Sequence, residues 1–262
     1  MRNALRRVRL RSSPGIWEGM FSLALLFGLW QAAGTFQVGG FGEIPTPVDV
    51  GRALVEAAGT SRYWSSWVVS GQRVALGFLA GVLIGVPLGL ALGMSRTFRG
   101  IVFPVLETLR PVPPLAWVPL SILFWPTLEM SIVFVIFLGA FFAVVLNVLG
   151  GVAAIDPSLL RAALSLGARP RHIFWKIVLP ATTPAIFTGM AVAMGLTWEI
   201  VVAAEIIAGK AGLGFLTWEG FVNGSLVAIL VAMVSIGVAG FLSSGLIWAV
   251  GRRATPWQKK MS

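Results

Sequence analysis

Six long apolar stretches constrain this chain more than any other feature of its sequence. They cover approximately residues 16–36, 69–94, 101–124, 130–154, 182–208 and 225–250. Each is about 20 residues or longer, which is the length an α-helix needs to cross a hydrocarbon core of about 30 Å. The segments between them are too short to form a separate soluble domain. The sequence therefore predicts an all-α membrane protein with about six transmembrane helices.

The composition supports a lipid environment rather than an aqueous one. Hydrophobic residues make up 57% of the chain and charged residues only 11%, against roughly 25% charged residues in a soluble domain. The net charge of +10 does not predict a nucleic-acid partner, because the basic residues lie between apolar runs and not on one soluble face. With no Cys and a single His, we expect no catalytic, cofactor-binding or metal-binding residues.

The basic residues also predict an orientation, because Lys and Arg gather in every second connecting segment. If residues 1–15 are cytoplasmic, the basic segments 95–100, 155–180 and 251–262 are cytoplasmic too. The positive-inside rule then favours N-in and C-in. We predict a basic cytoplasmic N-terminus (1–15), a six-span domain (16–250) with a loop at 155–180, and a basic cytoplasmic C-terminus (251–262). The outer loop 37–66 is either a short surface helix or a plain connector.

The loop between the fourth and fifth stretches has the signals of a short helix. Asp156 suits an N-cap, Pro157 suits the first helical position, and Gly167 suits the residue just past a helix end. The predicted helix, Pro157–Leu166, is too short to cross a membrane. Apolar residues at helical spacing then predict an interfacial amphipathic helix over 168–178.

At this loop the sequence resembles the importer permeases of the ATP-binding-cassette (ABC) superfamily. Their loop carries Glu-Ala-Ala, three residues, Gly, nine residues, and then Ile-x-Leu-Pro. The residues at those spacings are Arg161, Ala162, Ala163, Gly167, Ile177, Leu179 and Pro180. Arg161 departs from the Glu of the general pattern and resembles the nitrate/sulfonate/taurine branch, within which the taurine and alkanesulfonate permeases are most similar.

The resemblance extends over nearly the whole chain. The proline-rich run 110–120 is similar to the third span of that branch, and Trp198 to Glu205 with Gly212-Leu213-Gly214 is similar to its fifth span and outer loop. A departure lies at residues 124–129, where relatives place a Phe-Gly-x-Gly-Glu turn. This departure concerns the shape of the outer gate.

The resemblance implies a fold, a function and a set of partners. The fold would be that of a type I ABC importer permease, and the helix 157–166 would be its coupling helix, docked on a separate ATPase. Two permease copies, a homodimer, would join two ATPases and an extracytoplasmic substrate-binding protein in a bacterial cell (inner) membrane. ATP and Mg²⁺ would lie in the ATPase, since this chain has no Gly-x4-Gly-Lys-Ser/Thr sequence. The cargo would be a small organic anion or oxyanion that crosses by alternating access.

Four residues inside the apolar stretches are candidates for the substrate pathway or gate: Arg110, Trp117, Trp198 and Glu199. Charged residues in a span usually face the bundle interior. Glu199 has a structural hydrogen bond to a neighbouring span as its alternative role. For Arg110 we favour a local pair with Glu107, at i, i+3 spacing, over anion attraction.

Other features have simpler explanations. Arg73 is expected to snorkel to the membrane surface. The stripes of small residues every four positions, Gly81, Gly85 and Gly89 and then Ala185, Gly189 and Ala193, favour helix packing over a pore lining. As an alternative function, an ion-driven secondary transporter or channel would use Glu199 or Glu205 as its ion site.

Overall fold

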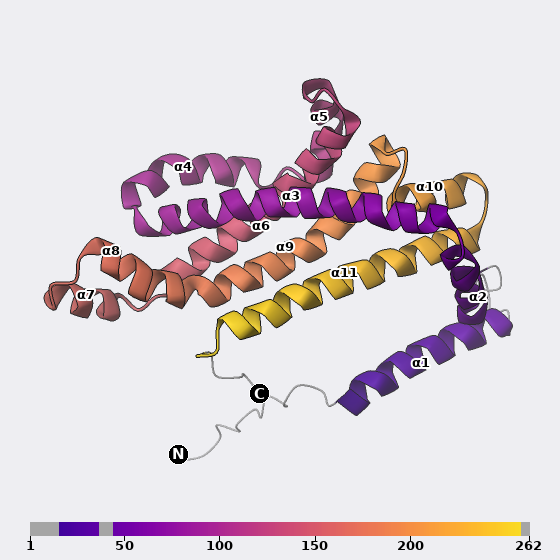
Figure 1. Ribbon diagram of the computed structural model, residues 1–262, viewed down its shortest axis with the longest axis horizontal. Coiled ribbons are helices and arrows are strands. Elements are labelled where there is room, and N and C mark those ends of the chain that lie inside the picture. The colour runs from indigo at the N-terminus through magenta and orange to yellow at the C-terminus, as the bar shows by residue number, and fades with distance from the viewer. Residues whose placement is uncertain (1–15, 37–43, 258–262) are drawn as a thin grey trace, which may run out of the picture.

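The computed structural model describes residues 16–36 and 44–257, which form helices joined by short turns. Four helical segments are long and apolar enough to cross a membrane: α3 (Ser61–Met94), α6 (Leu128–Ala153), α8 with α9 (Pro170–Ala208), and α11 (Leu226–Ala254). They run along the long axis of the molecule, and α1 (Ile16–Thr35) stands apart from them, next to α2 (Pro47–Ala58) (Figure 1). The predicted all-α fold is confirmed. The number of six spans and the N-in orientation stay predictions.

The two ends of the molecule differ in their elements. Figure 1 shows α7 (Pro157–Ser165), α8 (Pro170–Ile173) and the start of α4 (Arg96–Leu109) at one end, which we call the α7 end. The opposite end, the α10 end, carries α2, α10 (Leu213–Val222) and the start of α3. The basic residues of the α7–α8 segment, of the first turn of α4 and of the last turn of α11 therefore gather toward one end, as the orientation prediction requires.

The third predicted span, 101–124, is not one continuous helix, which corrects the expectation of a single helix across this stretch. α4 ends at Leu109, and a single 3-10 turn (Pro114–Trp117) leads into the short α5 (Val118–Phe124). Pro111, Pro113 and Pro114 cause the break, because each lacks an N–H donor and disfavours a helical conformation at the residue before it. As a result α5 projects from the bundle in Figure 1.

α6 is the centre of the bundle, and it packs against α3 through glycines. A Cβ atom on Gly81 would lie 2.6 Å from the Cβ of Ala140, and one on Gly89 would lie 2.7 Å from the Cβ of Val148. On the side of α9, a Cβ on Gly189 would lie 2.7 Å from the Cβ of Asn147. These glycines let the helix backbones approach closely. The helix-packing role of both small-residue stripes is confirmed.

The segment after α7 does not form a separate amphipathic helix. A π-helical turn, Phe174–Val178, joins α8 directly to α9 (Leu179–Ala208). The N–H of Leu179 donates to the carbonyl of Phe174, five residues back, and Pro180 has no N–H to continue the α-helical pattern. The helix that contains the fifth predicted span therefore begins at Pro170, twelve residues before the predicted start of that span. The loop helix that we left open at 48–58 is present as α2.

Candidate functional site

The helix α7 is defined by its own end signals. At its start, the Asp156 carboxylate accepts a hydrogen bond from the Ser158 N–H at 2.8 Å, and Pro157 occupies the first turn. This backbone hydrogen bond lowers the pKa of Asp156 from its ordinary value. At its end, the N–H of Gly167 donates to Leu164 O and the N–H of Ala168 donates to Ala163 O. These two bonds form a Schellman motif, and Gly167 supplies the positive φ of 77° that it needs. The helix predicted at 157–166 is confirmed.

α7 exposes an apolar stripe instead of burying it. Leu159, Ala162, Ala163 and Leu166 share one face at helical spacing. Leu159 is 50% exposed and Leu166 is 88% exposed, and no residue of α7 is buried. Only Leu160 packs against the main core. A helix outside the long spans with an exposed apolar face is a surface suited to a partner.

The other residues of the matched loop pattern lie after α7, around the start of α9. Ile177, Leu179 and Pro180 are half-buried, and Leu179 packs against the main core. Arg161, Ala162 and Gly167 are exposed. The structure thus divides the predicted coupling residues into a surface group on α7 and a supporting group where α9 begins.

Two of the four predicted pathway residues share a pocket. Arg110, at the end of α4, and Glu199, on α9, both line a cavity of ≈ 400 Å³ whose walls include Pro113, Phe142 and Leu196. Both charged side chains are exposed. Among the described residues no ion pair joins Arg110 to Glu107, so the local pair that we favoured is wrong.

The remaining pathway candidates lie in two different places. Trp198 and Glu199 line a groove of ≈ 740 Å³ between α9 and α11, and the Trp198 indole donates to Ser243 Oγ at 2.9 Å. Trp117 lines a separate pocket with Trp125 and Phe134. Glu199 therefore links two cavities, and Trp117 stands outside both.

A buried charge network at the α10 end was not predicted. The guanidinium of Arg73 donates to Glu205 at 2.8 Å, to Glu129 at 2.7 Å and to the carbonyl of Ala211 at 2.6 Å. Side-chain exposure is 3% for Arg73, 0% for Glu205 and 64% for Glu129. The snorkelling role predicted for Arg73 is wrong. α3 begins at Ser61 rather than near 69, so Arg73 lies three turns inside the helix and cannot reach its end.

Glu205 also holds the loop between α9 and α10. Its carboxylate accepts hydrogen bonds from Ser70 Oγ at 2.7 Å and from the Gly214 N–H at 2.8 Å, in addition to the bond from Arg73. Gly212 has a φ of 121°, and a Cβ there would lie 2.4 Å from the carboxylate. Three donor groups therefore occupy the Glu205 carboxylate, which leaves it poorly placed to bind a transported ion.

One signal in the sequence could have found this network. An ionisable residue inside a span generally has a partner of opposite charge, and Arg73 and Glu205 both fall in apolar stretches. Their separation of more than a hundred residues hid the pairing. The pattern that joins Glu205 to Gly212-Leu213-Gly214 was noticed, and the contact between them is its physical reason.

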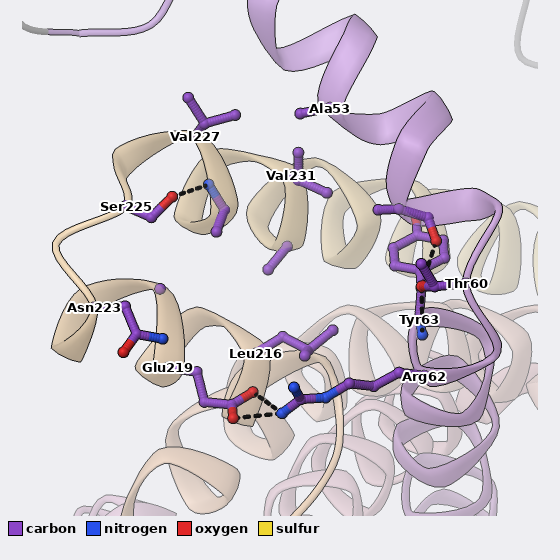
Figure 2. Close-up of a pocket in the computed structure, with 14 residues that line it drawn as sticks. Ala53, Thr60, Arg62, Tyr63, Leu216, Glu219, Asn223, Ser225, Val227 and Val231 are labelled. Carbon is purple, nitrogen blue, oxygen red and sulfur yellow. Dashed lines mark hydrogen bonds and ion pairs between the residues drawn. The ribbon is translucent and has the colours of Figure 1, made fainter.

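A second polar site lies nearby at the α10 end. Figure 2 shows a pocket in which Arg62 and Glu219 point toward each other and form an ion pair. The pocket has a volume of ≈ 380 Å³ and lies between α2, the start of α3, α10 and α11. Deeper in, the Tyr63 hydroxyl is hydrogen-bonded to Ser235 Oγ at 2.7 Å. The sequence did not predict this site.

Most of this chain is similar in sequence to known proteins. A family model described as "binding-protein-dependent transport system inner membrane component" matches residues 81–255. A taurine transport system permease protein of Escherichia coli (strain K12) is 35% identical over 241 residues, 90% of this chain and 88% of that protein. A nitrate import permease protein of Leptolyngbya laminosa is 33% identical over 189 residues, 72% and 68% of the two chains.

Solved structures with the same fold are more distant in sequence. A methionine ABC transporter in an inward-facing conformation gives a TM-score of 0.63 at 19% identity, covering 73% of this chain and 95% of that one. A bacterial alginate ABC transporter, in complex with a periplasmic protein bound to an alginate pentasaccharide, gives a TM-score of 0.59 at 16% identity, covering 92% and 91%. These likenesses establish the fold alone.

Proposed function

The chain belongs to the family of binding-protein-dependent transport system inner membrane components, and from this membership we propose how its residues work. It is the permease subunit of an ATP-driven importer in the inner membrane, as the sequence predicted. We propose that α7 is its coupling helix, that the α7 end is cytoplasmic, and that ATP is hydrolysed by a partner subunit.

The observation that carries the proposal is the exposed apolar stripe of α7. The stripe belongs to a helix that is capped at both ends by its own residues, so its shape does not depend on a partner. Leu159 and Leu166 would fill a groove on the ATPase, while Ala162 and Ala163 would allow a close approach. Leu160, together with Leu179 and Pro180 at the start of α9, would transmit the motion of α7 to α9.

The assembly and the cargo follow from the relatives and from the charges of this chain. We propose that two copies of this chain, two ATPases and an extracytoplasmic binding protein form the transporter, with ATP and Mg²⁺ held by the ATPases. The cargo would be a small organic anion or oxyanion of the sulfonate, taurine or nitrate kind. Arg110 lines the pocket that it shares with Glu199, and its planar guanidinium fits an anion with several oxygens.

The test uses two glycines in the same type of motif at opposite ends of the molecule. Gly167 and Gly224 both have positive φ, both close a Schellman motif, and a Cβ on either would meet nothing within 4 Å. Alanine at either position carries a similar strain of about 1–2 kcal/mol. Gly167→Ala should weaken co-purification of the ATPase and lower ATP-driven uptake by about tenfold, and Gly224→Ala should leave both intact.

Two results would count against the proposal. Equal losses in both variants would mean that strain alone, and not the position in α7, causes the effect. Full uptake with Gly167→Ala would show that α7 does not couple ATP hydrolysis to transport. The ion-driven alternative gains no support from Glu205, whose carboxylate is occupied. Uptake that collapses with an ionophore and ignores ATP depletion would favour that alternative.

A further inference from the structure

We propose that Arg73, Glu129 and Glu205 form a latch that closes the α10 end of the permease, and that Glu129 is the arm that releases. This inference rests on the proposed function, because a latch has meaning only in a protein that alternates between two states. Arg73 and Glu205 are positioning residues in this account. They hold the loop between α9 and α10 in place and do not touch the cargo.

The network joins α3, α6, α9 and the loop that follows α9. Arg73 on α3 contacts Glu129 at the start of α6, Glu205 near the end of α9, and Ala211 in the following loop. Ser70, one turn earlier on α3, donates to Glu205 and accepts from the N–H of Leu213 at 2.8 Å. The other ion pair in the described part of the chain, Arg62 with Glu219, joins only two helices.

The two arms of the network differ in their exposure. The Arg73–Glu205 arm is enclosed, so breaking it would leave charges in an apolar interior. The Glu129 side chain is 64% exposed in the first turn of α6, so its separation from Arg73 would not leave a carboxylate enclosed in the protein. A reversible switch is expected to use the arm whose separation costs less. The geometry therefore assigns Glu129 as the arm that separates from Arg73 and Glu205 as the arm that stays bound to it.

The Arg73–Glu129 pair lies at one end of the seam between α3 and α6. The close glycine contacts of this seam begin at Gly77, one turn further along α3, where a Cβ would lie 2.7 Å from the Cβ of Ile136. α6 begins at Leu128, so the ion pair is in its first turn. The seam is thus tightly packed on one side of the pair and ends on the other. An opening between α3 and α6 at this end would therefore have to break this pair.

α9 links the latch to the α7 end of the molecule. α9 runs as one helix from Leu179, toward the α7 end, to Ala208, just beyond Glu205. At 1.5 Å per residue, roughly 39 Å separate Leu179 from Glu205 along the axis. A tilt of α9 driven from the α7 end would move Glu205, and Arg73 with it, relative to Glu129. The latch would therefore respond to the ATPase as well as to a binding protein at the α10 end.

The experiment measures how strongly ATP hydrolysis depends on the binding protein. The complete transporter is reconstituted in lipid with its ATPase, and ATPase activity is measured with and without the binding protein. Glu129→Gln removes the charge of the releasable arm. We expect activity without the binding protein to rise about fivefold, the population shift that follows from losing one half-exposed ion pair. Glu129→Asp keeps the charge and should restore most of the dependence.

The control breaks the other ion pair at the same end. Glu219→Gln removes the Arg62 partner in the pocket of Figure 2 and does not touch the loop between α9 and α10. It should leave the dependence on the binding protein unchanged. The latch is refuted if Glu129→Gln leaves that dependence unchanged, if Glu219→Gln alters it equally, or if Glu129→Gln lowers only the thermal stability. If no ATPase associates with the unaltered chain, the proposed function fails before the latch is reached.

Discussion

The α7 end and the α10 end are held together in different ways. At the α7 end, a nine-residue helix gets its shape from its own neighbours: Asp156 at its start and Gly167 after its end. At the α10 end, Arg73 and Glu205 are more than a hundred residues apart in the chain and belong to a network that also includes Ser70, Glu129 and the loop after α9. One end is exposed and locally determined, and the other is buried and determined by long-range contacts.

This difference suggests how the two ends divide the work. A helix that is stable without a partner can be presented to one and moved by it as a unit. The enclosed charges of Arg73 and Glu205 are expected to stay paired, because a partly separated ion pair in an apolar interior is unfavourable. We therefore expect changes at the α7 end to affect partner binding with little loss of stability, and changes to the buried Arg73–Glu205 pair to affect the stability of the whole fold.

The largest expected effect tests the buried side of this comparison. Glu205→Ala removes an acceptor from Arg73, Ser70 and the Gly214 N–H, and should lower the free energy of unfolding by about 3–5 kcal/mol. Unfolding of the purified chain in detergent would measure it. The double change Arg73→Met with Glu205→Met should cost less than the sum of the single changes. A loss below about 1 kcal/mol for Glu205→Ala would contradict the role of the network.

A second effect tests packing between the two ends. Gly81→Ala places a Cβ 2.6 Å from Ala140 and 2.9 Å from the backbone nitrogen of Phe141, so α3 and α6 must separate. We expect a loss of about 1–3 kcal/mol. Gly71→Ala, in the same helix, meets nothing within 4 Å and should be neutral or slightly stabilising. Equal thermal midpoints for the two variants would show that the seam is not tightly packed.

The smallest effect on stability tests the exposed side. Asp156→Ala removes the N-cap of α7 and should weaken ATPase binding about fivefold, without a change in the unfolding midpoint of the chain. Asp156→Asn keeps a capping oxygen and should bind normally. A fall in the midpoint as large as that of Gly81→Ala would erase the distinction between the two ends.

Asp156 also allows a prediction of how ATPase binding depends on pH. The pKa of Asp156 is lowered by the hydrogen bond from the Ser158 N–H. A lowered pKa in the folded chain stabilises it above the ordinary aspartate value of about 3.9, and this contribution is lost as pH falls through the lowered value. ATPase binding should therefore be constant between about pH 6 and pH 8 as far as this cap is concerned. A drop within that range that Asp156→Asn abolishes would contradict it.

The sequence predicted what neighbouring residues determine. The caps of α7, four of the long apolar helices and the glycine stripes follow from short-range patterns, and the structure bears them out. Apolarity alone could not place helix ends inside a run, so the break at Pro111–Pro114 and the early start of α3 were missed. The second of these errors led directly to the wrong role for Arg73. Pairing between distant spans has no signal in a single sequence beyond the cost of an unpaired charge.

The most direct test of the coupling role of α7 is a cross-link from its exposed stripe. The chain contains no Cys, so a single Leu166→Cys variant, at a position that is 88% exposed, can carry a photoactivatable cross-linker without background. Leu123→Cys on α5, at a position that is 82% exposed, is the matched control. We predict that Leu166→Cys links to the ATPase of the assembled transporter and that Leu123→Cys does not. An ATPase that co-purifies with the chain but links from position 123 and not from position 166 would contradict the account.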